Sequence, residues 1–280
     1  MKYRYLAAGV FFSAIGASAA AAEICTVIAD AVSGNQLVQH GDCSRRVTPA
    51  STFKIAISLM GYDSGFLKDE HRPVLPYRAG YVDWRESWLH PADPTKWMND
   101  SVVWFSQQVT LSLGKERFAK YTRKFGYGNA DVLGDQEHDG LTFSWIGSSL
   151  RISPLEQVAF LTKLVNRRLG VSHHAYAMTE KLTKFGPVSG GWQAHGKTGA
   201  SSGWGWYIGW ASKAGRTIVF ARLIQKDDAQ PKHVPIGLLT RDGFIADFRQ
   251  LIGSVTNQER FAVKAGLFQP RTHSTIRQTI

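Results

Sequence analysis

The stretch Thr48-Pro49-Ala50-Ser51-Thr52-Phe53-Lys54 predicts the start of a helix that carries two reactive side chains. Threonine is favoured as a helix cap and proline at the first helical position, so we expect Ser51 in the first turn. Lys54 follows three residues later and would share a helix face with Ser51. A serine hydroxyl becomes a nucleophile when an adjacent base takes its proton, and a neutral amine is such a base. Taken alone, the pattern is explained more simply as a capped surface helix.

Three further motifs follow Ser51 in a fixed order: Ser101-Val102-Val103, Tyr127-Gly128-Asn129 and Lys197-Thr198-Gly199. Together the four resemble the motif set of the serine-reactive penicillin-recognising enzymes. The combination of Ser-x-Val with Tyr-Gly-Asn is similar to the class D, or oxacillinase-type, β-lactamases, whereas class A has Ser-Asp-Asn as its second motif. The resemblance extends from Cys25 to about Phe268.

Alternation of apolar and polar residues predicts strands near both ends of the chain, and helical patterns lie between them. Strands are expected on either side of Ser33-Gly34-Asn35 and in three runs between Trp192 and Ile224. A helix is expected to continue from the Ser51 turn through residues 53–60 and to end around residues 61–65. Further helices are expected over the following ranges: 102–113, 115–125, 154–168 with Ser153 as cap, and 238–251. Residues 71–98 show no periodicity and predict a loop with short helical pieces.

This order of elements predicts a mixed α/β fold, with an antiparallel β-sheet flanked by helices and an inserted all-α subdomain. The resemblance implies the same β-lactamase/transpeptidase-like fold. We expect a signal peptide over residues 1–21 and a single catalytic domain over residues 22–280. In that domain the sheet would use about residues 23–48 and 190–268, and the helical insertion about residues 50–188.

The resemblance implies roles for the residues that carry the chemistry. Ser51 would form an acyl-enzyme, and the backbone N–H groups of Ser51 and Ala200 would form the oxyanion hole. Ser101 would relay a proton to the leaving nitrogen, and Lys197 would add positive charge beside it. Thr198 and Arg241 would bind a substrate carboxylate, although Arg241 is also explained as a solvated arginine at a helix start.

Hydrolysis of the acyl-enzyme needs a base, and the chain has no class A Glu-x-x-Leu-Asn segment to provide one. We expect Lys54 to lie in apolar surroundings near Val103 and Ile146, which favour its neutral form. A neutral amine can add carbon dioxide. The resemblance implies that Lys54 is N-carboxylated and acts as general base, with Trp145 donating a hydrogen bond to it. No cofactor is expected beyond the carbon dioxide or bicarbonate consumed.

The third motif and four tryptophans have structural explanations beside functional ones. Tyr127, Gly128 and Asn129 are explained by default as a turn, because glycine and asparagine tolerate left-handed backbone geometry. Four tryptophans are candidates for the rim of the pocket, and packing in the core is the alternative for most of them. They are Trp84, Trp88, Trp97 and Trp104.

The first residues indicate export. Lys2 and Arg4 precede an apolar stretch from Leu6 to Ile15 and a run of small residues, which is typical of a cleaved signal peptide and too short to span a bilayer. We therefore expect a periplasmic protein without a membrane anchor. Removing Lys2 and Arg4 lowers the formal net charge from +11 to +9. This charge suits an anionic small molecule, here a β-lactam, or is solvated surface; nucleic acid is not expected as a partner.

Cys25 and Cys43 lie at equal distances in sequence from Gly34, at the open end of the predicted hairpin. A disulfide between them is reasonable in an oxidising compartment, and two free thiols are the alternative. No histidine pair or third cysteine lies at metal-ligand spacing, so no metal site is predicted.

The sequence therefore predicts a class D serine β-lactamase that hydrolyses penicillins and oxacillin-like β-lactams and confers antibiotic resistance. A cell-wall D,D-peptidase, a β-lactam sensor domain and a non-catalytic binder of anions are the alternatives. Each predicts a different fate of the acyl-enzyme: slow release, no release, or no acyl-enzyme at all. The sequence leaves open whether the protein is a monomer or a homodimer.

Overall fold

The structure is a computed structural model that describes residues 22–227, 230–231 and 233–264. The predicted signal peptide, residues 1–21, lies outside the described residues. The strands and α-helices are β1 (Glu23–Asp30), β2 (Gln36–Gly41), α1 (Lys54–Asp63), α2 (Pro94–Asp100), α3 (Val103–Phe125), α4 (Gly140–Phe143), α5 (Pro154–Val165), α6 (His173–Leu182), β3 (Lys184–Val188), β4 (Trp192–Ala200), β5 (Trp204–Lys213), β6 (Arg216–Gln225) and α7 (Ile236–Lys264).

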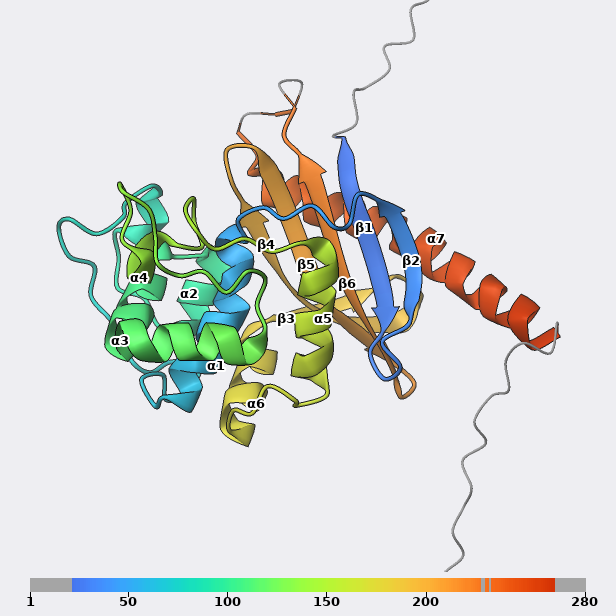
Figure 1. Cartoon of the computed structure of the whole chain (residues 1–280), viewed down its shortest axis with the longest axis horizontal. Helices are drawn as coiled ribbons and strands as arrows, with labels where there is room; N and C mark the ends of the chain where they lie inside the picture. The colour runs from blue at the N-terminus through green and yellow to red at the C-terminus, as the bar shows by residue number, and fades with distance from the viewer. Residues whose placement is uncertain (1–21, 228–229, 232, 265–280) are drawn as a thin grey trace, which may run out of the picture.

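The strands form one six-stranded sheet in the order β2-β1-β6-β5-β4-β3. All neighbouring strands are antiparallel. Because β1 pairs with β6, the N-terminal hairpin joins the last strands of the chain, as predicted. Helix α5 covers one face of the sheet and α7 covers the other (Figure 1). On the α7 face, Phe244 stacks on Phe220 of β6 with ring centroids 4.3 Å apart. The mixed α/β fold with a helix-flanked antiparallel sheet is therefore confirmed.

The remaining helices gather beside the sheet in a helical region that contains α1, α2, α3, α4 and α6 (Figure 1). Helix α3 breaks at Gly114, whose φ of 73° is left-handed, which agrees with the two helices predicted on either side of it. The predicted cap of α5 is also present, because Ser153 and Glu156 form a reciprocal capping box.

Three features of the fold differ from the predictions. Helix α6 was not predicted. Strand β3 lies at the end of the segment predicted to be helical, and its Gly186 and Pro187 are residues that weaken a strand pattern. Helix α7 begins at Ile236 and continues to Lys264, well past the predicted end at residue 251.

The N-terminal hairpin contains the predicted disulfide. Cys25 and Cys43 are bonded, with their Cα atoms 5.0 Å apart. Cys43 does not face Cys25 in the ladder, because Cys25 pairs with Gly41. At Gly41 the backbone has φ = 74°, and a Cβ there would lie 2.2 Å from the carbonyl oxygen of Ile24. The glycine therefore allows the chain to turn so that Cys43 returns to Cys25.

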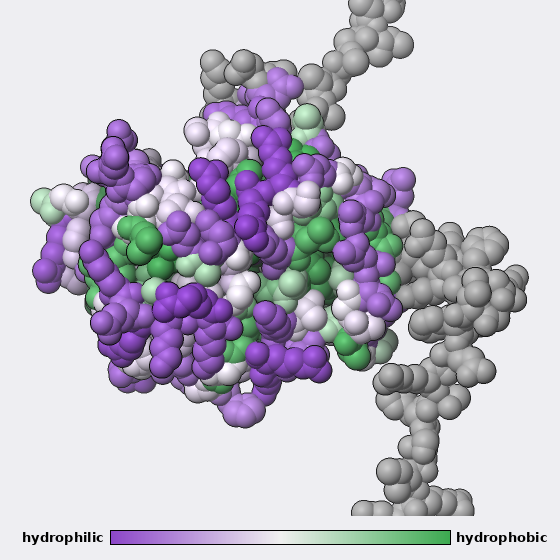
Figure 2. All heavy atoms as spheres, in the orientation of Figure 1, coloured by the Kyte–Doolittle hydropathy of each residue, from purple (hydrophilic) through white to green (hydrophobic). Residues whose placement is uncertain are grey.

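The visible face of the molecule is largely hydrophilic, with small apolar areas between the polar side chains (Figure 2). In the described part of the chain, no helix is both long enough and apolar enough to cross a membrane.

Candidate active site

The segment that carries Ser51 is a tight turn ahead of α1. Residues Ala50–Phe53 form a 3-10 turn, and the α-helix begins at Lys54. The prediction that Thr48 caps a helix starting at Pro49 is wrong, because Thr48 has other partners. Its hydroxyl donates to the carbonyl of Ile146 at 3.5 Å, and its own carbonyl accepts from the indole N–H groups of Trp204 and Trp206 at 3.1 Å. The turn is thus held by β5 and by the loop after α4.

Ser51 and Lys54 form the first polar pair of the site. The Lys54 ammonium or amine nitrogen lies 3.3 Å from the Ser51 hydroxyl oxygen. Lys54 is completely buried. Burial, followed by the charges of Lys197 and Arg85, holds the pKa of Lys54 well below the usual lysine value. Because a neutral amine can accept a proton, this pair has the geometry of a nucleophile beside a base.

Ser101 and Lys197 form the second polar pair. Ser101 lies between α2 and α3 in a left-handed conformation, with φ = 60° and ψ = 35°, so it ends α2 one residue before the cap of α3. The Nζ of Lys197 on β4 donates to the Ser101 hydroxyl at 3.1 Å. Burial, followed by the charges of Arg85 and Arg241, lowers the pKa of Lys197 to about 7. Lys197 can therefore donate or accept a proton near neutral pH.

Strand β4 passes close to the Ser51 turn because residue 199 is glycine. A Cβ at Gly199 would lie 2.9 Å from the carbonyl oxygen of Pro49 and 3.0 Å from the Thr52 side chain. On the other side, a Cβ at Gly237 of α7 would lie 2.6 Å from the Gly199 carbonyl oxygen. Glycines at both positions let the turn, the strand and the helix meet, which places Ala200 at the same cavity as Ser51.

The two polar pairs open onto one cavity of about 140 Å³. Five predicted site residues line it, and residues from the 71–98 loop and the start of α7 complete it. The lining residues are Ser51, Ser101, Val103, Thr198, Ala200, Trp84, Arg85, Trp88, Asn99, Pro235, Gly237 and Leu238. Of the four tryptophans considered for the rim, Trp84 and Trp88 lie there, whereas Trp97 and Trp104 are completely buried in the core.

Three predicted residues lie behind or beside this cavity. Trp145 is 1% exposed, packs on Phe53 with ring centroids 5.8 Å apart, and accepts a backbone hydrogen bond from Ala50. Ile146 contributes its carbonyl to Thr48. Arg241 does not line the cavity: it donates to Asp242 at 2.8 Å and lies over the Phe185 ring.

The Tyr127-Gly128-Asn129 motif supports the site from outside the cavity. The buried Tyr127 hydroxyl donates to Gln157 at 3.3 Å, and Gln157 donates to the Thr52 hydroxyl at 3.0 Å. A Cβ at Gly128 would lie 2.0 Å from the Arg151 carbonyl oxygen, and the Asn129 side chain bonds the backbone of residues 149 and 151. The motif is thus a left-handed turn, as its glycine and asparagine predict, and it contacts the Ser51 turn through Gln157.

Sequence reasoning missed two residues at this site. Arg85 lines the cavity and lowers the pKa of both lysines. Gln157 connects Tyr127 to the Ser51 turn. Arg85 lies in a segment without periodicity, and its only sequence signal is its position between Trp84 and Trp88. Gln157 has no local signal apart from being a polar residue on the buried face of α5.

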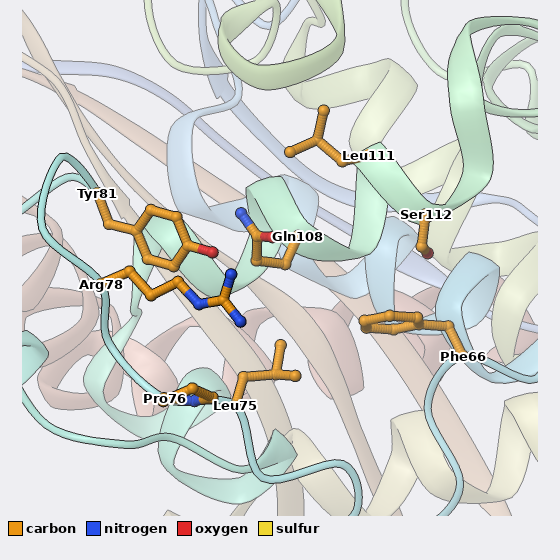
Figure 3. Close-up of a pocket in the computed structure, with 8 residues that line it drawn as sticks. All are labelled: Phe66, Leu75, Pro76, Arg78, Tyr81, Gln108, Leu111 and Ser112. Carbon is orange, nitrogen blue, oxygen red and sulfur yellow. The ribbon is translucent and has the colours of Figure 1, made fainter.

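A second, larger hollow of about 300 Å³ lies between the 71–98 loop and α3. Arg78 and Tyr81 border it from the loop and Gln108 from α3, and Phe66 lies on the side away from Arg78 and Tyr81 (Figure 3). None of the predicted site residues lines this hollow.

Comparison with known proteins gives consistent relatives. Residues 24–237 match the family described as penicillin binding protein transpeptidase domain. The chain is 42% identical over 247 residues to β-lactamase OXA-9 of Klebsiella pneumoniae, which covers 82% of this chain and 88% of the relative. It is 35% identical over 208 residues to β-lactamase OXA-1 of Escherichia coli, with 71% and 74% covered. The crystal structure of the class D β-lactamase OXA-427 superposes with a TM-score of 0.77 at 39% identity, covering 82% of this chain and 99% of that one.

The chain therefore belongs to the penicillin-binding protein transpeptidase family. Within this family it is a class D β-lactamase, an enzyme that hydrolyses β-lactams.

Proposed function

We propose that the enzyme opens the β-lactam ring of penicillins and oxacillin-like substrates through an acyl-Ser51 intermediate, with an N-carboxylated Lys54 as general base, and so confers antibiotic resistance. The observation that carries this proposal is the completely buried Lys54, whose Nζ lies 3.3 Å from the Ser51 hydroxyl and whose pKa is held low. A neutral lysine amine reacts with carbon dioxide to give a carbamate and a proton. The carbamate supplies a basic oxygen in place of the amine nitrogen.

The residues around Lys54 fit such a group. An anion in place of the buried amine is attracted by the positive charges of Lys197 and Arg85, which lie close enough to lower the pKa of Lys54. Trp145 is 1% exposed and packs against Phe53 and Phe118 behind the Ser51 turn. A buried indole N–H favours an acceptor, which a carboxylated lysine would offer.

The proposed reaction has two halves. Ser51 loses its proton to the base and attacks the β-lactam carbonyl, while the backbone N–H groups of Ser51 and Ala200 bind the oxyanion. The ring C–N bond then breaks, and the nitrogen receives a proton through Ser101 from Lys197, which regains one from the protonated base. In the second half, the base, again deprotonated, takes a proton from the water that attacks the acyl carbon. It delivers this proton to the Ser51 oxygen as the ester C–O bond breaks. Thr198, with Arg241 after a side-chain rotation, would bind the substrate carboxylate.

The export of the enzyme is also a proposal. The charged and apolar order of residues 1–21 is typical of a signal peptide, and the Cys25–Cys43 disulfide suits an oxidising compartment such as the periplasm.

The test is multiple-turnover hydrolysis of benzylpenicillin by the purified protein, with and without bicarbonate. We expect sustained turnover that rises with bicarbonate and falls at least ~10³-fold in Ser51→Ala and Lys54→Ala, with Lys68→Ala, at an exposed lysine, as control. With ¹³C-labelled bicarbonate, a carbamate NMR signal should appear in the wild type and in Ser51→Ala but not in Lys54→Ala. A single stoichiometric burst would instead indicate a sensor or a penicillin-binding protein, and bicarbonate-dependent turnover by Lys54→Ala would overturn the base assignment.

A further inference from the structure

Arg85 is the only charged side chain among the described residues that line the cavity of Ser51. It comes from the loop that precedes α2, next to Trp84, and its backbone is extended, with φ = −142° and ψ = 137°. It therefore lines the cavity from the loop before α2, whereas Thr198 and Ala200 line it from β4. This is a feature of the cavity that the proposed reaction does not use.

Arg85 has no anionic partner within the described part of the chain. No Asp or Glu side chain there lies within ion-pair distance of its guanidinium. Arg241, in contrast, already donates to Asp242. The guanidinium of Arg85 is therefore available to an anion that enters the cavity.

The position of the guanidinium is fixed by an aromatic ring. Its Cζ lies 5.6 Å from the ring centroid of Trp88, a cation–π arrangement. Trp88 is only 3% exposed, its indole N–H donates to the Asp100 carbonyl at 3.0 Å, and its own carbonyl accepts from Trp104 at 2.8 Å. Because the ring is held in place, Arg85 loses less conformational freedom on binding a ligand than a solvated arginine would.

The charges around the cavity also leave a cation for a second anion. With Lys54 carboxylated as proposed, positive charge at the site comes from Lys197 and Arg85, and the charge of Arg85 reaches the reacting groups because it lowers the pKa of Lys197. The carboxylate on the bicyclic nucleus of a β-lactam binds, in the proposed reaction, at Thr198 of β4. An anionic group on the acyl side chain of the substrate would be free to reach Arg85, which lines the same cavity.

We propose that Arg85 forms a subsite for a second anionic group, carried on the acyl side chain, so that the enzyme favours dianionic penicillins over their monoanionic parents. This rests on the proposed function. Arg85 binds and orients the substrate and takes no part in proton transfer.

The test compares benzylpenicillin with α-carboxybenzylpenicillin, which differs from it by one side-chain carboxylate. We expect Arg85→Ala to lower kcat/KM for the carboxylated substrate about tenfold more than for benzylpenicillin, since a hydrogen bond to a charged group contributes this much at a partly solvated site. Arg85→Lys should restore part of the difference, because it keeps the charge. Arg78→Ala, in the same loop but lining the separate hollow of Figure 3, should leave the ratio unchanged.

An equal fall for both penicillins would contradict the proposal, because it would mean that Arg85 binds the carboxylate common to both or acts through the lysines. If Arg85→Ala changes kcat/KM for neither penicillin, the proposal is contradicted as well. If the wild type fails to hydrolyse benzylpenicillin, the proposed function fails first. The Kd values of the two penicillins for the Ser51→Ala protein and for its Arg85→Ala derivative still decide the subsite, which requires a loss of affinity confined to the carboxylated compound.

Discussion

Lys54 is a residue whose position benefits the reaction at the expense of stability. It is completely buried, and its pKa in the folded protein is well below the ordinary value of 10.5. Between these two pKa values the unfolded chain binds more protons than the folded one. The free energy of unfolding should therefore rise with pH up to about 10.5, and Lys197, with a pKa of about 7, contributes in the same direction.

We predict that Lys54→Met inactivates the enzyme but stabilises it at pH 7 by about 1–2 kcal/mol, and that its stability depends less on pH. The measurement is denaturant unfolding between pH 6 and 9 in carbon-dioxide-free buffer. Some pH dependence of the free energy of unfolding should remain in Lys54→Met, because Lys197 still titrates with a lowered pKa. Lys68→Met, at an exposed lysine, should change neither quantity. A less stable Lys54→Met protein with the wild-type pH slope would refute this account.

The residues proposed to react were easier to place in one site than their neighbours, because the proposed chemistry restricts which residue types can serve. Ser51, Lys54, Ser101 and Lys197 were identified from motif order, and the structure brings them together in two hydrogen-bonded pairs. Arg85 was missed because binding an anion requires only a cation at the right place, which many loop positions could supply. Site residues can therefore be predicted from the sequence where they stand in short motifs of fixed spacing. They cannot be predicted where the conformation of an irregular loop determines which side chain reaches the cavity.

At the scale of elements, α5 is linked to the Ser51 turn by buried side chains. Gln157 accepts from Tyr127 and donates to Thr52, and the Thr52 hydroxyl donates to the Pro49 carbonyl at 2.7 Å. All three residues are completely buried. This series of bonds holds the 3-10 turn in the orientation that places Ser51 beside Lys54, and the tyrosine motif thereby acts on the site without touching the cavity.

We predict that Gln157→Leu lowers kcat for benzylpenicillin by about tenfold to a hundredfold with little change in KM, because Ser51 loses part of its positioning. The control is Gln107→Leu, which removes another buried glutamine whose amide bonds only the Thr142 carbonyl. Gln107→Leu should lower the melting temperature comparably but leave kcat near the wild-type value. If both variants lose stability and neither loses kcat, Gln157 has a purely structural role.

Helices and strands with a regular apolar–polar pattern were predicted correctly, and those without one were missed. The strands from Trp192 onward alternate clearly and were found. Strand β3 was not, since Gly186 and Pro187 interrupt its pattern, which an edge strand tolerates. The start of α1 was misplaced because Thr48 forms tertiary hydrogen bonds to β5 and to Ile146 that outweigh its local preference as a cap.

At the scale of the whole molecule, the requirement that terminal strands find partners predicted the sheet, whereas the placement of α7 depends on a buried arginine. Arg222 of β6 donates to Thr26 of β1 at 2.7 Å and to Asp247 of α7 at 2.7 Å. Its guanidinium lies 5.3 Å from the Phe244 ring centroid. One side chain thus joins the first strand, the last strand and the last helix, which no local sequence pattern indicates.

The two partners of the Arg222–Asp247 pair are unequally buried. We therefore expect that removing the exposed carboxylate alone destabilises the protein more than replacing the whole polar group. The Arg222 side chain is 6% exposed and the Asp247 side chain 52%. Asp247→Ala should lower the free energy of unfolding by about 1–3 kcal/mol, because the buried Arg222 cation keeps, among the described residues, only the longer ion pair to Glu23, at 3.7 Å. A triple variant, Thr26→Val with Arg222→Met and Asp247→Ala, replaces the polar group by apolar side chains of similar size and should recover most of that loss. Urea unfolding of the two proteins checks the order. A triple variant less stable than Asp247→Ala would show that the arginine contributes more through its hydrogen bonds to β1 and its stacking on Phe244 than its buried charge costs.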